Sequence, residues 1–113
     1  MESQLKLYDD MVDYYDKVGH ETPEVALAGT AYHNEVYKDG ALSHKMKRLM
    51  SLAIALQARC GECVVGHTKH AVDAGATKAE ILETVAVATV IGGSLAGASM
   101  WRVVRVLEEM GKW

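Results

Sequence analysis

Apolar residues recur every three to four positions along most of the chain, which is the spacing of one face of a helix. Near the start, Tyr8, Met11 and Val12 share such a face, which predicts a first helix over residues 5–18, ended by residues 19–21. No segment alternates apolar and polar residues for long enough to predict a strand. The pattern therefore predicts an all-α fold.

Helix-start signals divide the rest of the first half of the chain. Thr22 is a suitable N-cap and Pro23 suits the first helical position, so a second helix is expected from Pro23 to residue 36 or 37. Ser43 is a suitable N-cap for a third helix, whose apolar residues continue at helical spacing to Leu56.

Three more helices are expected in the second half. A fourth should carry the two cysteines of the chain and end at Ala74-Gly75, because glycine readily adopts the left-handed conformation that closes a helix. Thr77 and Glu80 have the spacing of a capping box, so a fifth helix should begin there and run to Gly92-Gly93. A sixth is expected over residues 94–110, which makes a bundle of about six helices.

The expected fifth helix is apolar on most sides, as its residues show: Ile81, Leu82, Val85, Val87, Val90 and Ile91. A helix that is apolar all round needs cover on every side, which one small domain rarely provides. We therefore expect a homo-oligomer. The uncharged stretch over residues 84–101 is about as long as the shortest membrane spans, but threonine, serine and glycine dilute it, so no membrane span is expected.

Composition and charge limit the domain number and the partners. The 113 residues fit a single domain over 1–113 with one modest core. The net charge is -3 and no basic cluster is present, so no nucleic-acid partner is expected. Residues 1–6 lack the apolar segment of a signal peptide, and a close cysteine pair in such a chain is typical of redox or metal chemistry. The expected location is cytoplasmic.

The candidate chemistry lies in Cys60-Gly61-Glu62-Cys63, which His67 follows one helical turn later. Residues three and four apart share a helix face, so Cys60 and Cys63 can approach disulfide geometry and His67 can contact Cys63. A thiol with the usual pKa of about 8.5 is only a few per cent thiolate at neutral pH. An imidazole base or a helix N-terminus raises that fraction, so these parts suit thiol–disulfide exchange.

Metal binding is the competing interpretation of the same face. Cys60, Cys63, His67 and His70 have the residue types of a Cys2His2 zinc site. Along a straight helix, Cys60 and His70 would be about 15 Å apart, whereas zinc ligands lie within about 2.3 Å of the ion. A site from Cys60, Cys63 and His67, or one shared between subunits, stays open. No cofactor is expected, because no nucleotide-binding motif is present.

Residues 40 to about 95 resemble the carboxymuconolactone decarboxylase/alkylhydroperoxidase D family. The positions that carry the resemblance lie before, within and after a CxxCxxxH motif: Leu42, Lys45, Lys47, Leu49, Met50, Cys60, Cys63, His67, Ala71, Ala74, Gly75, Ala76, Glu80, Ile81, Gly92 and Gly93. The resemblance implies an all-α subunit that assembles into trimers or hexamers. It also implies that members with the cysteine pair reduce peroxides or exchange disulfides, whereas the lactone decarboxylases typically lack the pair.

One position departs from the family's peroxidase pattern. The resemblance implies a glutamate twelve residues before the first cysteine, as part of a proton relay, and Arg48 stands there. Arginine stays charged and cannot shuttle a proton, although its charge can stabilise a thiolate. Glu62 or Glu83 could replace the missing carboxylate if the fold points either one inward. Disulfide exchange needs less proton transfer than peroxide reduction, so this departure affects it less.

The sequence thus predicts an oligomeric thiol–disulfide oxidoreductase, with catalytic Cys60, Cys63 and His67 and with three auxiliary candidates: Arg48, Glu62 and Glu83. Its substrate would be a peroxide or a disulfide, and its reductant an external dithiol or a redox protein. Which cysteine attacks first stays open, because His67 favours Cys63 and the helix N-terminus favours Cys60. The alternatives are a metal-binding protein and a decarboxylase-like lyase that has kept the scaffold.

Overall fold

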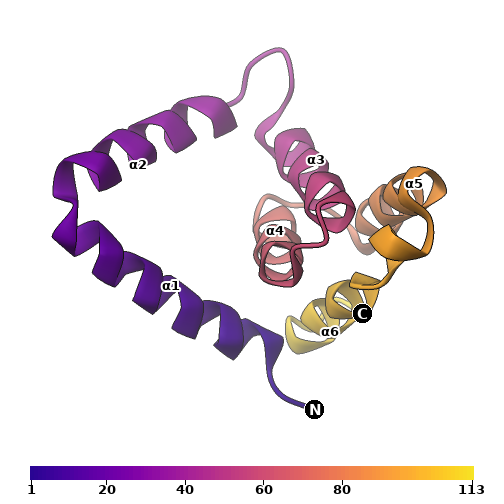
Figure 1. Ribbon diagram of the computed structural model, residues 1–113. Helices are drawn as coiled ribbons and strands as arrows, with labels where there is room; N and C mark the ends of the chain where they lie inside the picture. Colours follow the sequence, from indigo (N-terminus) through magenta and orange to yellow (C-terminus); the bar gives the residue numbers. More distant parts are fainter.

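The computed structural model describes all 113 residues, which form six helices and no strand (Figure 1). The helices are α1 (Gln4–Glu21), α2 (Pro23–Tyr37), α3 (His44–Gln57), α4 (Gly61–Asp73), α5 (Lys78–Gly97) and α6 (Met100–Glu109). The all-α fold and the number of helices predicted from the sequence are confirmed.

Helices α3 to α6 form the body of the molecule, in which α4 packs against α3, α6 and the first part of α1 (Figure 1). The core between them is aliphatic, and its fully buried side chains come from all four helices: Leu52, Leu56, Val64, Ile81, Val103 and Leu107. Burial of such side chains is the main favourable term in folding. It holds α4, the helix that begins at the cysteine pair, between α3 and α6.

Several helix ends lie where the local signals predicted them. Ser43 caps α3 by accepting the amide of Met46, and Thr77 forms a capping box with Glu80 at the start of α5. Gly75 follows the end of α4 with φ of 92°, a left-handed conformation that glycine adopts without steric cost. Each signal acts through the backbone of a single turn, so tertiary packing does not override it.

The boundary between α1 and α2 differs from the prediction. α1 continues through Gly19 to Glu21, because one glycine weakens a helix without ending it. Thr22 precedes α2 but does not cap it, since its hydroxyl donates to the carbonyl of Val18 in α1. The prediction that residues 19–21 end the first helix was therefore early by one turn.

The start of α6 also differs from the prediction. Gly93, with φ of 62° and ψ of -149°, breaks the helical conformation at the paired glycines, as predicted. Helical turns then resume as far as Gly97, and α6 begins at Met100 rather than near Ser94. The turn between the break and α6 includes Ala96, which is buried. This turn is therefore packed against the rest of the chain, and the final helix begins only after it.

Two apolar surfaces have no cover within the chain. No residue of α2 is buried, and Figure 1 shows α2 on the outside, joined to the body only through its neighbours. The Cα radius of gyration, 14.5 Å, accordingly exceeds the roughly 13 Å of a compact domain of this length. On α5, Val90 and Ile91 are 81% and 80% exposed. By length and composition alone, α5 could cross a membrane, but its other face packs on α3 in the core.

Candidate active site

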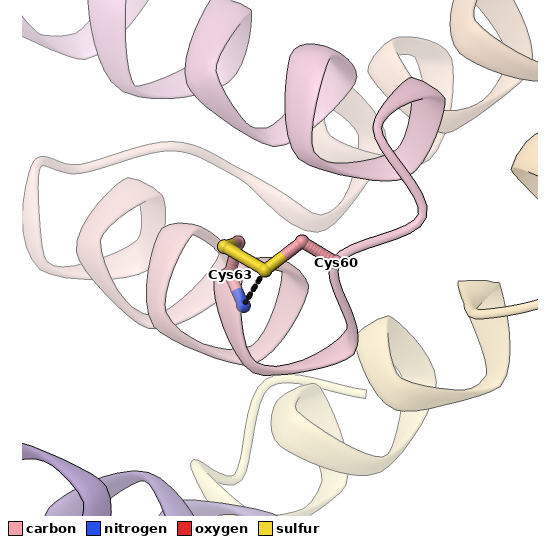
Figure 2. Close-up of a disulfide and its surroundings, with 2 residues drawn as sticks. All are labelled: Cys60 and Cys63. Carbon is pink, nitrogen blue, oxygen red and sulfur yellow. Dashed lines mark hydrogen bonds between the residues drawn. A yellow bond between two sulfur atoms is a disulfide. The ribbon is translucent and has the colours of Figure 1, made fainter.

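Cys60 and Cys63 form a disulfide at the start of α4 (Figure 2). The turn before it closes α3, because the amides of Arg59 and Cys60 donate to the carbonyls of Leu56 and Ala55. Arg59 has φ of 59°, the left-handed conformation that glycine usually supplies at this place in a helix end. The turn sets Cys60 as the N-cap residue of α4.

The sulfur of Cys60 accepts the backbone N–H of Cys63 at 3.3 Å, the contact drawn as a dashed line in Figure 2. The two Cα atoms are 5.2 Å apart, which is within the range that disulfides span. A side-chain acceptor at this position satisfies one free amide of the first turn. The same amide and the helix dipole favour a thiolate at Cys60 once the disulfide is reduced. The predicted placement of the pair at a helix N-terminus is confirmed.

The disulfide opens onto a pocket of about 510 Å³, lined by residues of α1 and of the start of α4: Tyr8, Met11, Cys60, Glu62, Cys63, Gly66 and His67. A second pocket of about 270 Å³ adjoins it and shares Tyr8, Met11 and Glu62. Both cysteines line the larger pocket, so an external reactant can approach the disulfide from that side.

His67 lies in this pocket with its imidazole half-buried. Its Nδ1 atom is buried and has no hydrogen-bond partner. Burial lowers the pKa of His67, and the nearby Arg48 and His33 lower it further. His67 is therefore neutral at pH 7 and is a weaker base than an exposed histidine.

Arg48 lies behind the pocket as a buried cation, only 8% exposed. Its guanidinium stacks on the ring of Tyr37, with the carbon 3.8 Å from the ring centroid, and it forms no ion pair with a carboxylate. One guanidinium nitrogen lies 3.4 Å from Nδ1 of His70. Because arginine only donates, Nδ1 of His70 is the acceptor. Burial and then Arg48 lower the pKa of His70 to about 4.

The two glutamates proposed as replacements for the relay carboxylate lie in different places. Glu62 is exposed in the first turn of α4 and lines both pockets. Glu83 is exposed on α5 and lines neither pocket. Only Glu62 therefore stands beside the cysteine pair, and the position twelve residues before Cys60 holds a buried positive charge.

The alternative metal set is not gathered into a metal site. No three His, Cys, Asp or Glu side chains lie together as ligands for an ion. The sulfur atoms of Cys60 and Cys63 are joined to each other, and His70 directs Nδ1 to Arg48.

Four residues that reach the site from α1, α2 and α6 were not singled out from the sequence. Tyr8 and Met11 of α1 form the wall of the pocket opposite the disulfide, and Tyr37 of α2 holds Arg48. Arg102 of α6 lies against the backbone of Gly61. No local pattern indicates these residues, because each reaches the site from a helix far away in the sequence.

The sequence and the fold are similar to those of known proteins. The profile of the carboxymuconolactone decarboxylase family matches residues 23–109. The chain belongs to this family. The match extends beyond the segment from 40 to about 95 that carried the resemblance, and it includes all of α2 and all of α6.

Solved structures of the carboxymuconolactone decarboxylase family have the same fold. The apo form of a family member from Legionella pneumophila has a TM-score of 0.91 and 28% identity, over 99% of this chain and 100% of that chain. A family member from Thermotoga maritima, for which a role in the antioxidative response has been suggested, has a TM-score of 0.69 and 34% identity. That match covers 76% of this chain and 89% of the Thermotoga chain.

Two bacterial relatives are similar in sequence over about two thirds of the chain. Uncharacterized protein 4 in the cox locus of Paracoccus denitrificans is 36% identical over 75 residues, which are 66% of this chain and 68% of that protein. An uncharacterized protein of Cupriavidus necator is 29% identical over 79 residues, which are 70% of each.

Proposed function

We propose that this member of the carboxymuconolactone decarboxylase family is a thiol–disulfide oxidoreductase that cycles between the Cys60–Cys63 disulfide and the dithiol. The observation that carries the proposal is the disulfide at a helix N-terminus, open to a pocket that His67 lines. A disulfide between residues three apart closes a very short loop, so it constrains the unfolded chain little. The role suggested for the Thermotoga protein is compatible with redox chemistry.

In the proposed cycle, the thiolate of one cysteine attacks a sulfur atom of a partner's disulfide. The attacked sulfur joins the cysteine in a mixed disulfide, the partner's S–S bond breaks, and the partner's other sulfur leaves with the electron pair and takes a proton from water. The other cysteine gives its proton to His67 or to water and attacks the first, which closes Cys60–Cys63 and releases the second partner thiolate. The partner gains two electrons, and an external dithiol or a redox protein then reduces Cys60–Cys63 again.

Disulfides fit this site better than peroxides as the oxidised substrate. Reduction of hydrogen peroxide expels hydroxide, whose conjugate acid, water, is a far weaker acid than a thiol, so the leaving group needs a proton. His67 is a poor proton donor because its lowered pKa leaves it neutral, and Arg48 cannot release a proton. A thiolate, whose conjugate acid has a pKa of about 8.5, leaves without that help.

A redox titration with mass-spectrometric counting of free thiols tests the function directly. We expect a reversible two-electron couple between about -300 and -180 mV, the range of catalytic dithiols. The variant with both Cys60 and Cys63 replaced by serine is the control and should show no couple. If the thiols never form an intramolecular disulfide, the redox function is wrong; metal analysis and a lactone decarboxylation assay of the serine variant would then test the alternatives.

The substrate preference is tested by oxidising the reduced protein with hydrogen peroxide or with hydroxyethyl disulfide. We expect the disulfide to react faster with the wild-type protein. Arg48→Glu supplies a carboxylate and removes the charge that lowers the pKa of His67, so it should raise the peroxide rate. Arg48→Lys keeps the charge and is the matched control. A wild-type protein that prefers peroxide would contradict the preference.

The exposed apolar face of α5 supports assembly with further copies of the chain. We propose a cytoplasmic homo-oligomer, and the family resemblance favours a trimer or hexamer. Val87, Val90, Ile91 and Leu95 are all more than half exposed on the same helix, and α2 adds Leu27. Burial of such side chains against a second copy removes them from water. Multi-angle light scattering measures the mass. A monomer at micromolar concentration would contradict the assembly, and Val90→Glu should dissociate it.

A further inference from the structure

A side chain of α6 brings a positive charge to the first turn of α4. The guanidinium of Arg102 lies so close to Gly61 that a Cβ atom there would be 2.9 Å from Nε and 3.0 Å from Cζ. Consecutive Cα atoms are 3.8 Å apart, so the guanidinium lies within about 8 Å of the Cα of Cys60. Glycine at the second position of the motif leaves the space that this side chain occupies.

Arg102 is held at this place rather than free in solvent. One of its terminal nitrogens donates to Oε1 of Gln4 at 2.6 Å, and Gln4 is only 3% exposed. The backbone N–H of Gln4 donates in turn to the Glu109 carboxylate at 2.9 Å. The start of α1 and the end of α6 therefore hold the guanidinium against the first turn of α4.

The surroundings of Cys63 are less favourable to a thiolate. Cys63 lies inside the first turn, and its backbone N–H donates to the sulfur of Cys60. Its candidate base is His67, which burial and Arg48 make a weaker base than usual. The helix amide and the Arg102 charge stabilise a Cys60 thiolate without accepting its proton. A Cys63 thiolate depends instead on His67, a base that holds the proton poorly.

Resting on the proposed function, we infer that Cys60 is the attacking cysteine and that Arg102 is the positioning residue that keeps it as a thiolate. The Cys60 thiolate attacks the partner disulfide and forms the mixed disulfide, and the partner's other sulfur leaves with the electron pair. Cys63 then loses its proton to His67 or water and attacks the Cys60 sulfur, which breaks the mixed disulfide, closes Cys60–Cys63 and releases the partner's remaining thiolate. His67 therefore serves the second step, in which Cys63 resolves the intermediate.

Two carboxylates near the same turn oppose the effect of Arg102 on the Cys60 thiolate. Glu62 and Asp10 line the smaller pocket together with Arg102, and both are exposed. Water screens exposed charges, so their repulsion of a thiolate is weaker than the attraction of a guanidinium fixed against the backbone. Arg59, which is exposed and directly precedes Cys60, adds a further positive charge.

Alkylation of single-cysteine variants tests the assignment. Cys63→Ser retains Cys60, and Cys60→Ser retains Cys63; rates with iodoacetamide between pH 5 and 9 report the thiolate fraction of each. We expect Cys60 to react at lower pH than Cys63. Adding Arg102→Gln should slow Cys60 at pH 7 by about threefold to tenfold and leave Cys63 within about twofold. Arg102→Lys should restore most of the rate.

Two controls separate charge from structure. Arg105→Gln removes a charge from the same helix that does not reach Gly61, so it should leave Cys60 unchanged. Gln4→Ala removes the anchor but keeps the charge, and circular dichroism checks that each variant is folded. A thiolate that forms first at Cys63, or a Cys60 rate that Arg102→Gln does not change, would overturn the inference. These rates need no redox cycle, so they are independent of the titration that tests the proposed function.

Discussion

Replacing Gly66 by alanine tests the packing that closes the pocket beside the disulfide. Gly66 lies within α4, and Tyr8 of α1 crosses it so closely that a Cβ atom would be 2.9 Å from Cζ of the tyrosine and 3.0 Å from its hydroxyl oxygen. Ordinary carbon–carbon contacts are about 3.5–4.0 Å. The added methyl group must therefore displace the Tyr8 ring, which also makes an edge contact with His70.

Two effects of opposite sign determine how much Gly66→Ala changes the free energy of unfolding. Alanine is better than glycine inside a helix by about 1 kcal/mol, whereas forced overlap in a packed site costs about 1–3 kcal/mol. We expect Gly66→Ala to lower the free energy of unfolding by about 1 kcal/mol. In a Tyr8→Ala background the overlap is gone, so the same substitution should raise it by about 0.5–1 kcal/mol. The effect of Gly66→Ala on stability should therefore have opposite signs with and without the Tyr8 ring.

Urea unfolding followed by circular dichroism measures the four free energies of this cycle. All four proteins are compared at one concentration, because assembly would make stability depend on it. Gly29→Ala is the matched control: a Cβ atom at Gly29 in α2 meets nothing within 4 Å, so alanine should stabilise equally in both backgrounds. If Gly66→Ala stabilises the protein that retains Tyr8, the reasoning is refuted.

Three other changes probe single features. Stability should fall by about 1–2 kcal/mol from pH 7 to 4, because His70 takes up a proton near pH 6.5 when unfolded but only near pH 4 when folded, and water screens part of the effect. His70→Asn should reduce this loss of stability, which urea midpoints at the two pH values measure. An equal loss in the variant would mean that other groups cause it. Arg59→Gly should stabilise by up to about 1 kcal/mol, because glycine adopts φ of 59° without strain; a lower melting temperature would contradict this. Thr77→Ala should cost about 1 kcal/mol in thermal unfolding by removing the α5 cap, and no cost would mean that Glu80 alone suffices.

Features that depend on one turn of backbone were predictable from the sequence. Ser43, Thr77 and Gly75 satisfy amides or carbonyls within a few residues of themselves, so their sequence context is also their structural context. The place of Cys60 at the start of α4 is of the same kind. The candidate site was therefore found where its residues are neighbours in the chain.

Contacts between distant helices were not predictable. Gly61 and Gly66 are glycines beside which another side chain fills the space of a Cβ atom, Arg102 in one case and Tyr8 in the other. A sequence displays the glycine but not the residue that lies over it. For the same reason Arg48 could be placed near the thiols only by resemblance, and its stacking on Tyr37 and its contact with His70 required the structure.

Under the proposed cycle, the charge around the cysteines explains the choice of substrate better than the shape of the pocket does. The chain is acidic overall, yet Arg48 from α3 and Arg102 from α6 bring fixed positive charge to two parts of α4. A positive charge stabilises a thiolate and leaves the neutral disulfide unaffected, so Arg102, which lies against the first turn of α4, favours the reduced form. The charge of Arg48 makes protonation of His67 less favourable. A site that holds thiolates well and supplies protons poorly suits leaving groups that depart as stable anions, and thiolates are such leaving groups, whereas hydroxide and alkoxides are not.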